Sequence, residues 1–177
     1  MKKKTLALVL ALTLLVVGVV GGTLAWLTDQ TAEVKNTFTV GDINIGLTET
    51  TTDYKMVPGN TIAKDPTVTV KANSEACWLF VKVTESTDLK DFITYAIAEG
   101  WTALPGVDAV YYREVPASAA DQTFSVLAGD AVTVKSDVTR TMLETAKTDA
   151  PTLTFQAYAI QRDHFATADA AWAEVSK

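Results

Sequence analysis

The chain has 177 residues but only one cysteine and one histidine, the residue types on which many catalytic and metal sites depend. The single thiol, Cys77, cannot form an internal disulfide bond and lies in an apolar stretch, so we expect a small buried side chain. The single imidazole, His164, cannot supply the usual set of zinc ligands. We therefore expect no catalytic residue, no metal site and no cofactor.

The motifs of common enzymes are missing as well. The sequence contains no Gly-x-Ser-x-Gly, no His-Glu-x-x-His and no phosphate-binding loop. A Ser-His-Asp triad would have to use Asp163 and His164, which are adjacent, and neighbouring side chains on an extended segment point apart. These absences argue against an enzyme.

Basic residues are scarce too, with 15 Lys and Arg against 21 Asp and Glu, a net charge of −6. Three of the 15 stand at Lys2–Lys4, so without residues 1–25 there remain 12 basic residues and a net charge of −9. An acidic chain repels nucleic acid and anionic lipid. We expect no nucleic-acid partner.

The first 25 residues have the three parts of a secretory signal peptide. Lys2–Lys4 form a basic start, Leu6–Val20 is an apolar run, and Thr23 and Ala25 are small residues at the −3 and −1 positions of a cleavage site before Trp26. The apolar run is about 15 residues long, shorter than the ~20 of a membrane-spanning helix. We expect cleavage after Ala25; an uncleaved leader would be the one contact with a membrane.

The rest of the chain consists of short apolar-alternating stretches separated by turns. Trp78–Val83 is apolar on both faces and predicts a central strand, whereas Thr67–Val70 predicts a half-buried one. Val57–Asn60 predicts a tight turn, because proline and glycine suit its two central positions. Further strands are expected at 37–40, 43–47, 93–98, 109–115 and 153–160. Seven or eight such strands predict an all-β sandwich.

Two finer features follow from local signals. Thr123–Leu127 and Ala131–Val134 flank Ala128-Gly129-Asp130, which predicts a hairpin. At the C-terminus, Thr167 can cap a helix over Ala168–Val175. Its apolar stripe, expected to pack on the sheets, is Ala168, Trp172 and Val175.

Two ordered motifs resemble the TasA/camelysin (CalY) family of exported proteins from Gram-positive bacteria, which the signal peptidase SipW processes. Gly21–Asp29 carries Gly-Gly-Thr-x-Ala, an aromatic-containing pair and Asp, and Asn36–Ile45 carries Asn-Thr-Phe-x-x-Gly followed by a strand. The resemblance covers about the first 50 residues and continues loosely at Val57–Asn60 and Ala157–Gln161. It implies a jelly-roll-like sandwich and a SipW-type peptidase as partner; strand spacing alone does not separate a jelly roll from an immunoglobulin-like topology.

The family includes TasA, a fibre protein of the biofilm matrix, and camelysin, described as a surface metalloendopeptidase. Because the sequence offers no zinc site, we expect the first role: a secreted subunit of the cell surface or matrix that polymerises with itself. A camelysin-like protease and a monomeric surface binding module are the alternatives.

The expected organisation is a signal peptide at 1–25, an N-terminal segment at 26–36 and a β-sandwich with its terminal helix at 37–177. Resemblance to TasA implies that the N-terminal segment inserts as a donor strand into the next subunit. An ordinary edge strand within one subunit is the alternative. The side chains expected to take part in assembly are Trp26, Leu27, Val34 and Phe38.

Overall fold

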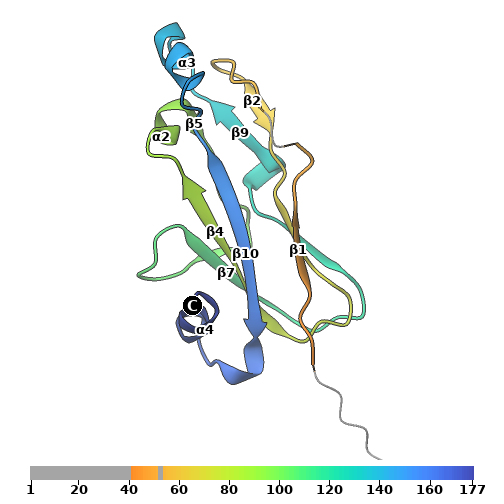
Figure 1. Cartoon of the computed structure of the whole chain (residues 1–177). Coiled ribbons are helices and arrows are strands. Elements are labelled where there is room, and N and C mark those ends of the chain that lie inside the picture. The colour runs from red at the N-terminus through yellow and green to blue at the C-terminus, as the bar shows by residue number, and fades with distance from the viewer. Residues whose placement is uncertain (1–40, 52–53) are drawn as a thin grey trace, which may run out of the picture. The chain divides into compact units, whose positions relative to one another are not determined.

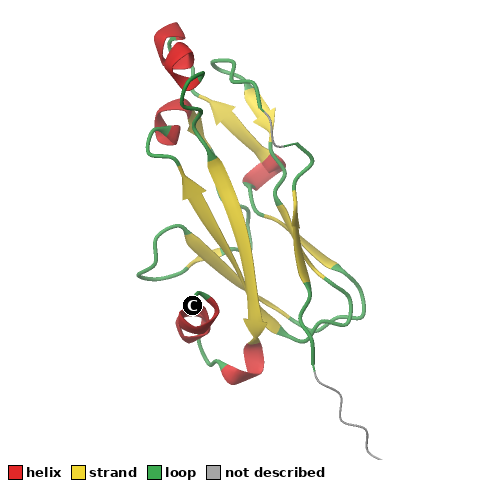
Figure 2. Ribbon diagram, in the orientation of Figure 1, coloured by secondary structure: helices red, strands yellow, loops and turns green. Residues whose placement is uncertain are grey.

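The computed structural model describes residues 41–51 and 54–177, which form three antiparallel sheets and a few short helices (Figures 1 and 2). The prediction of an all-β fold is confirmed. No helix within the described ranges is long and apolar enough to cross a membrane. The strands are β1 (Ile45–Thr48), β2 (Thr61–Ala63), β3 (Thr67–Val70), β4 (Cys77–Glu85), β5 (Ile93–Thr94), β6 (Thr102–Ala103), β7 (Val110–Val115), β8 (Gln122–Ser125), β9 (Ala131–Val134) and β10 (Leu153–Gln161). The α-helices are α2 (Leu89–Phe92), α3 (Arg140–Ala146) and α4 (Ala168–Val175).

The largest sheet has the order β10-β4-β7-β6, with β4 at its centre. As the apolar run of Trp78–Val83 predicts, β4 is buried on both faces from Cys77 to Val81. Cys77, Leu79 and Val81 belong to one cluster of buried side chains, and Trp78 and Phe80 belong to another. The period of two along a strand produces this division.

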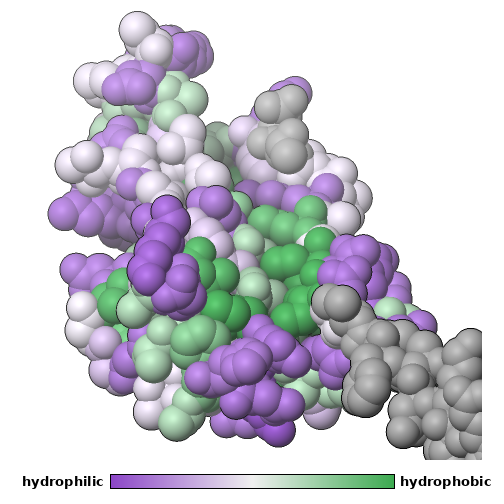
Figure 3. Space-filling view, turned by 60° about the horizontal axis from the view of Figure 1, so that its bottom comes forward, coloured by the Kyte–Doolittle hydropathy of each residue, from purple (hydrophilic) through white to green (hydrophobic). Residues whose placement is uncertain are grey.

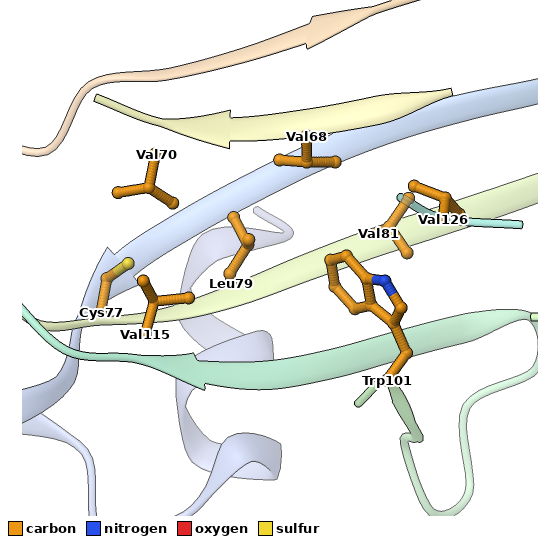
Figure 4. Close-up of a cluster of buried hydrophobic side chains, with 8 residues drawn as sticks. All are labelled: Val68, Val70, Cys77, Leu79, Val81, Trp101, Val115 and Val126. Carbon is orange, nitrogen blue, oxygen red and sulfur yellow. The ribbon is translucent and has the colours of Figure 1, made fainter. Parts of the chain in front are cut away.

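A second sheet, β1-β3-β8, packs against the inner face of the first (Figure 4). Val68 and Val70 of β3 share a core with Leu79 and Val81 of β4. Trp101 closes this core, and its indole N–H donates to the Ser125 carbonyl oxygen at 2.8 Å, which satisfies the one polar atom of the ring.

The third sheet, β2-β9-β5, corrects the predicted hairpin: β8 and β9 do not pair with each other. Instead, β8 pairs with β3 and β9 pairs with β2. Between these two ladders, the Lys64 N–H donates to the Asp130 carbonyl at 2.8 Å, and the Val126 N–H donates to the Pro66 carbonyl at 2.9 Å. The sequence between β8 and β9 forms a kink rather than a reversal, because Gly129 and Asp130 both adopt left-handed backbone, with φ of 65° and 48°.

The same kink shortens the strand predicted at 93–98. Regular pairing of β5 with β9 covers only Ile93 and Thr94. Beyond it the chain stays beside β8 through the bridge Ile97–Leu127 and the Ala98 N–H, which donates to the Val126 carbonyl. The ladder is interrupted because the partner strand bends at Ala128–Asp130.

The C-terminal helix is confirmed from Ala168 to Val175, with the Thr167 hydroxyl accepting from the Ala170 N–H at 3.3 Å. The helix covers the outer face of the large sheet. The ring of Trp172 lies 5.3 Å from Phe80 and 5.1 Å from Tyr158, measured between centroids. Trp172 and Val175 are only partly buried.

Candidate assembly surface

Among residues 41–51 and 54–177, strand β10 pairs only with β4, which leaves its other edge unpaired within the described chain. The Arg162 N–H donates to the Ala76 carbonyl at 2.9 Å, and the Thr152 carbonyl accepts from the Ser86 N–H at 2.9 Å. The even-numbered residues of β10 therefore direct their backbone N–H and C=O groups toward β4. Hydrogen-bonded positions alternate along an antiparallel strand. The odd-numbered residues therefore direct their backbone N–H and C=O groups away from the sheet; they are Leu153, Phe155, Ala157, Ala159 and Gln161.

Within the same described ranges, strand β1 presents a second unpaired edge on the other sheet. It pairs only with β3, and the Lys71 N–H donates to the Asn44 carbonyl at 2.8 Å. By the same alternation, the backbone groups of Ile45 and Leu47 point outward. No strand of residues 41–51 or 54–177 pairs with either edge.

The two unpaired edges lie near each other along a seam between the sheets, with Cα atoms of β1 and β10 within 8 Å. Five partly buried apolar side chains of the seam contact the first core: Ile43, Ile45, Phe155, Ala157 and Ala159. Leu47, on the same strand as Ile45, is 37 % exposed. Figure 3 shows an apolar area at the surface next to the point where the described chain begins. The seam thus combines unsatisfied backbone groups with apolar surface.

Two hollows lie at the Leu153 end of the seam. One, of about 370 Å³, is lined by residues of β1 and β10 including Leu47 and Phe155. The other, of about 430 Å³, is lined mainly by apolar side chains including Met56, Ile62 and Leu153. Lys64, Leu153 and Thr154 line both hollows.

Lys64 is buried, with 6 % of its surface exposed, and it has three partners. Its ammonium lies 2.6 Å from Glu49 Oε1, and 4.6 and 5.4 Å from the ring centroids of Tyr54 and Phe155. The Tyr54 hydroxyl also donates to Glu49 Oε1, at 2.7 Å. Burial and that hydrogen bond raise the pKa of Tyr54. The cluster compensates the charge that Lys64 brings into the wall of the seam.

The two residues considered for chemistry lie at the Gln161 end of β10: Cys77 is the register partner of Gln161, and His164 follows in the next turn. Cys77 is fully buried, as predicted, and burial raises the pKa of its thiol to about 11. His164 is exposed in a 3₁₀ turn at Arg162–His164, beside Asp163. In the described part of the chain, no group of three His, Cys, Asp or Glu side chains could hold a metal ion.

Sequence reasoning recognised β10 as a strand but missed its free edge and the Lys64 cluster. Nothing in the sequence around Lys64 signals that its side chain is buried, since Ala63 and Asp65 are unremarkable neighbours. The residues predicted for signal cleavage and assembly lie outside the described residues: Thr23, Ala25, Trp26, Leu27, Val34 and Phe38.

Comparison of the chain with protein-family models, with curated proteins and with solved structures finds no match.

Proposed function

We propose that this protein is a secreted structural subunit of the cell surface or biofilm matrix of a Gram-positive bacterium, and that it polymerises by strand addition. The observation that carries the proposal is the seam, where two unpaired strand edges flank partly buried apolar side chains. Unpaired edges attract a further strand, because each free N–H and C=O group gains a hydrogen bond. A surface metalloendopeptidase and a monomeric binding module are the alternative roles.

The spacing of the edges specifies how a strand would enter. A strand paired on both sides needs about 9.6 Å between its neighbours, twice the usual 4.8 Å. The Cα atoms of β1 and β10 lie within 8 Å of each other, so insertion between them requires the two strands to separate by at least about 2 Å. Near Leu153, β10 extends past the end of β1, and a strand there would pair with β10 alone above the two hollows.

We further propose a jelly-roll-like topology. Strands β4 and β7 pair with each other, and both lie in the sequence between β3 and β8, which also pair. A long antiparallel ribbon folded over itself has this order of pairs. The next pair outward in such a ribbon is β1 with β10, and these strands approach without pairing. The seam is then the open outer pair of the roll.

The donor in this proposal is the segment 26–36, with Trp26, Leu27 and Val34 and the following Phe38 as apolar side chains for the seam of the next subunit. Donation in one direction is a heterologous contact, which does not close and so builds a filament. A SipW-type peptidase would release the segment by cutting after Ala25, so a subunit could polymerise only after export.

A proline on the free edge tests the acceptor. Ala157→Pro removes an N–H that points into the seam and leaves the ladder with β4 intact. Ala103→Pro is the matched control, because Ala103 has an outward N–H on β6, at the other edge of the same sheet. We expect the protein starting at Trp26 to form filaments, Ala103→Pro to behave likewise, and Ala157→Pro to stay monomeric with an unchanged circular dichroism spectrum.

The donor is tested separately with a protein that starts at Asn36, which we expect to fold and stay monomeric. Sedimentation velocity and negative-stain electron microscopy report the assembly. Filaments from the shortened protein, or from Ala157→Pro at the wild-type rate, would contradict strand addition at this seam.

A further inference from the structure

A cleft of about 610 Å³ lies between α2, β5, the end of β4 and β7, and it shares Leu89 and Ile93 with the second hollow of the seam. Its floor is apolar and includes Leu89, Ile93 and Ile97. This volume accommodates one or two sugar rings, since ligand pockets for small molecules span about 300–1,000 Å³.

Two tyrosines and a carboxylate give the cleft hydrogen-bonding groups above its apolar floor. Tyr95 and Tyr111 are each half-buried, so each ring offers a surface to the cleft. The Tyr95 hydroxyl donates to Glu85 Oε1, which holds this carboxylate at the rim. Burial and this hydrogen bond raise the pKa of Tyr95, so its hydroxyl stays protonated. An apolar ring face beside a fixed carboxylate suits a pyranose, which has both C–H faces and hydroxyl donors.

The cations around the cleft are the second observation. Lys90 and Lys135 line it, and the Lys135 ammonium donates to the Lys90 carbonyl, which leaves two of its protons for other acceptors. Neither ammonium lies within 4 Å of a carboxylate of residues 41–51 or 54–177. Within the described chain, these two lysines of one cleft therefore have ammonium donors that are available to an anion.

Arg113 lies outside the lining of the cleft, two residues beyond Tyr111 on the same face of β7. Its guanidinium carbon lies 3.9 Å from the Phe124 ring centroid and 5.3 Å from that of Trp101. The buried Nε has no partner, and no described group accepts from either Nη, neither of which is enclosed. Any side chain at position 100 would place its Cβ 3.0 Å from Arg113 Nη2, so the guanidinium fits there because residue 100 is glycine.

We propose that this cleft binds a carboxylated sugar unit of an acidic polysaccharide. The pyranose lies over the tyrosines and the apolar floor, its hydroxyls donate to Glu85, and its carboxylate accepts from Lys90 and Lys135. The guanidinium of Arg113 takes the carboxylate of the next unit. A fibre subunit with this site would hold polysaccharide while its seam holds the next subunit, so the inference goes beyond the proposed function and does not depend on it.

Titration of the purified protein with galacturonic-acid oligomers, by isothermal calorimetry and amide NMR, tests the site. Galactose oligomers of equal length are the neutral comparison. We expect acidic oligomers alone to bind, with shifts concentrated around Tyr95 and Tyr111. Lys90→Gln and Lys135→Gln should each weaken binding about fivefold to tenfold, because each removes a charge-assisted hydrogen bond.

Lys82→Gln is the matched control, because Lys82 is an exposed lysine of β4 outside the cleft. It removes the same charge and should leave affinity unchanged. Equal binding of neutral oligomers, an equal loss in Lys82→Gln, or no binding at millimolar oligomer would overturn the proposal. The measurement is made below the assembly concentration and repeated with Ala157→Pro, so a failure of strand addition leaves the binding result interpretable.

Discussion

The buried Lys64–Glu49 pair predicts an asymmetric response to mutation. Removing the acid in Glu49→Ala leaves the Lys64 ammonium, 6 % exposed, without its carboxylate at 2.6 Å. Breaking a buried pair in this way costs about 3–5 kcal/mol. The rings of Tyr54 and Phe155 face the ammonium in the wild type as well as in the variant, so they do not offset this loss. We expect Glu49→Ala to lower the free energy of unfolding by about 3–5 kcal/mol.

Removing the base should cost less. In Lys64→Met the remaining carboxylate keeps the Tyr54 hydroxyl as a donor, and the Glu49 side chain is 17 % exposed, so water solvates it further. Methionine also fills most of the volume of the lysine stem. We expect the free energy of unfolding to fall by about 1 kcal/mol, the net contribution of one hydrogen bond, because the remaining carboxylate still has a hydrogen-bond donor.

Urea unfolding of the two single variants and of Glu49→Ala/Lys64→Met, followed by tryptophan fluorescence below the assembly concentration, measures these differences. The double variant should be close to Lys64→Met alone, because no buried charge is then stranded. If Lys64→Met cost as much as Glu49→Ala, or if the two losses were additive, the asymmetry inferred from the burial of Lys64 would be wrong.

Three further results are expected. N-terminal sequencing of the exported protein should begin at Trp26, and Ala25→Leu should block processing, since a signal peptidase accepts only small residues there; a mature product that still contains Leu6–Val20 would contradict this. Trp172→Ala should lower the free energy of unfolding by about 2–3 kcal/mol. This is less than the loss of about 3–5 kcal/mol for a fully buried ring, because Trp172 is only partly buried against Phe80 and Tyr158. A loss within experimental error would mean that the helix is only loosely attached to the sheet. Cys77 should resist iodoacetamide at pH 8 until the protein unfolds, because the side chain is fully buried and its thiol pKa is raised to about 11; rapid labelling of the native protein would refute its place in the core.

Elements whose signals are local could be predicted from the sequence. The turn at Val57–Asn60 forms as expected, with the Asn60 N–H donating to the Val57 carbonyl at 3.0 Å and Gly59 at a φ of 79°. The helix Ala168–Val175 begins at its Thr167 cap, with Ala168 of the expected stripe buried and Trp172 and Val175 partly buried. Ala171, which lies outside that stripe, is fully buried. The doubly apolar Trp78–Val83 became the central strand. In each case the interactions involve neighbours in the chain or the period of one element, both of which side-chain identity specifies.

The features that make up the candidate sites were decided by tertiary structure. Alternation shows which side chains of β10 are apolar, but backbone groups are the same in every residue, so the sequence is silent on which strand lies beside it. The glycine-containing segment 128–130 was likewise compatible with either a hairpin or a kink. The kink forms because β8 pairs with β3 and β9 pairs with β2, two strands that follow each other in the chain. The burial of Lys64 and the approach of Lys90, Lys135 and Tyr111 in one cleft depend on contacts between distant segments. Such contacts are set only when the sheets pack, because packing, and not local propensity, determines which polar groups lose their water.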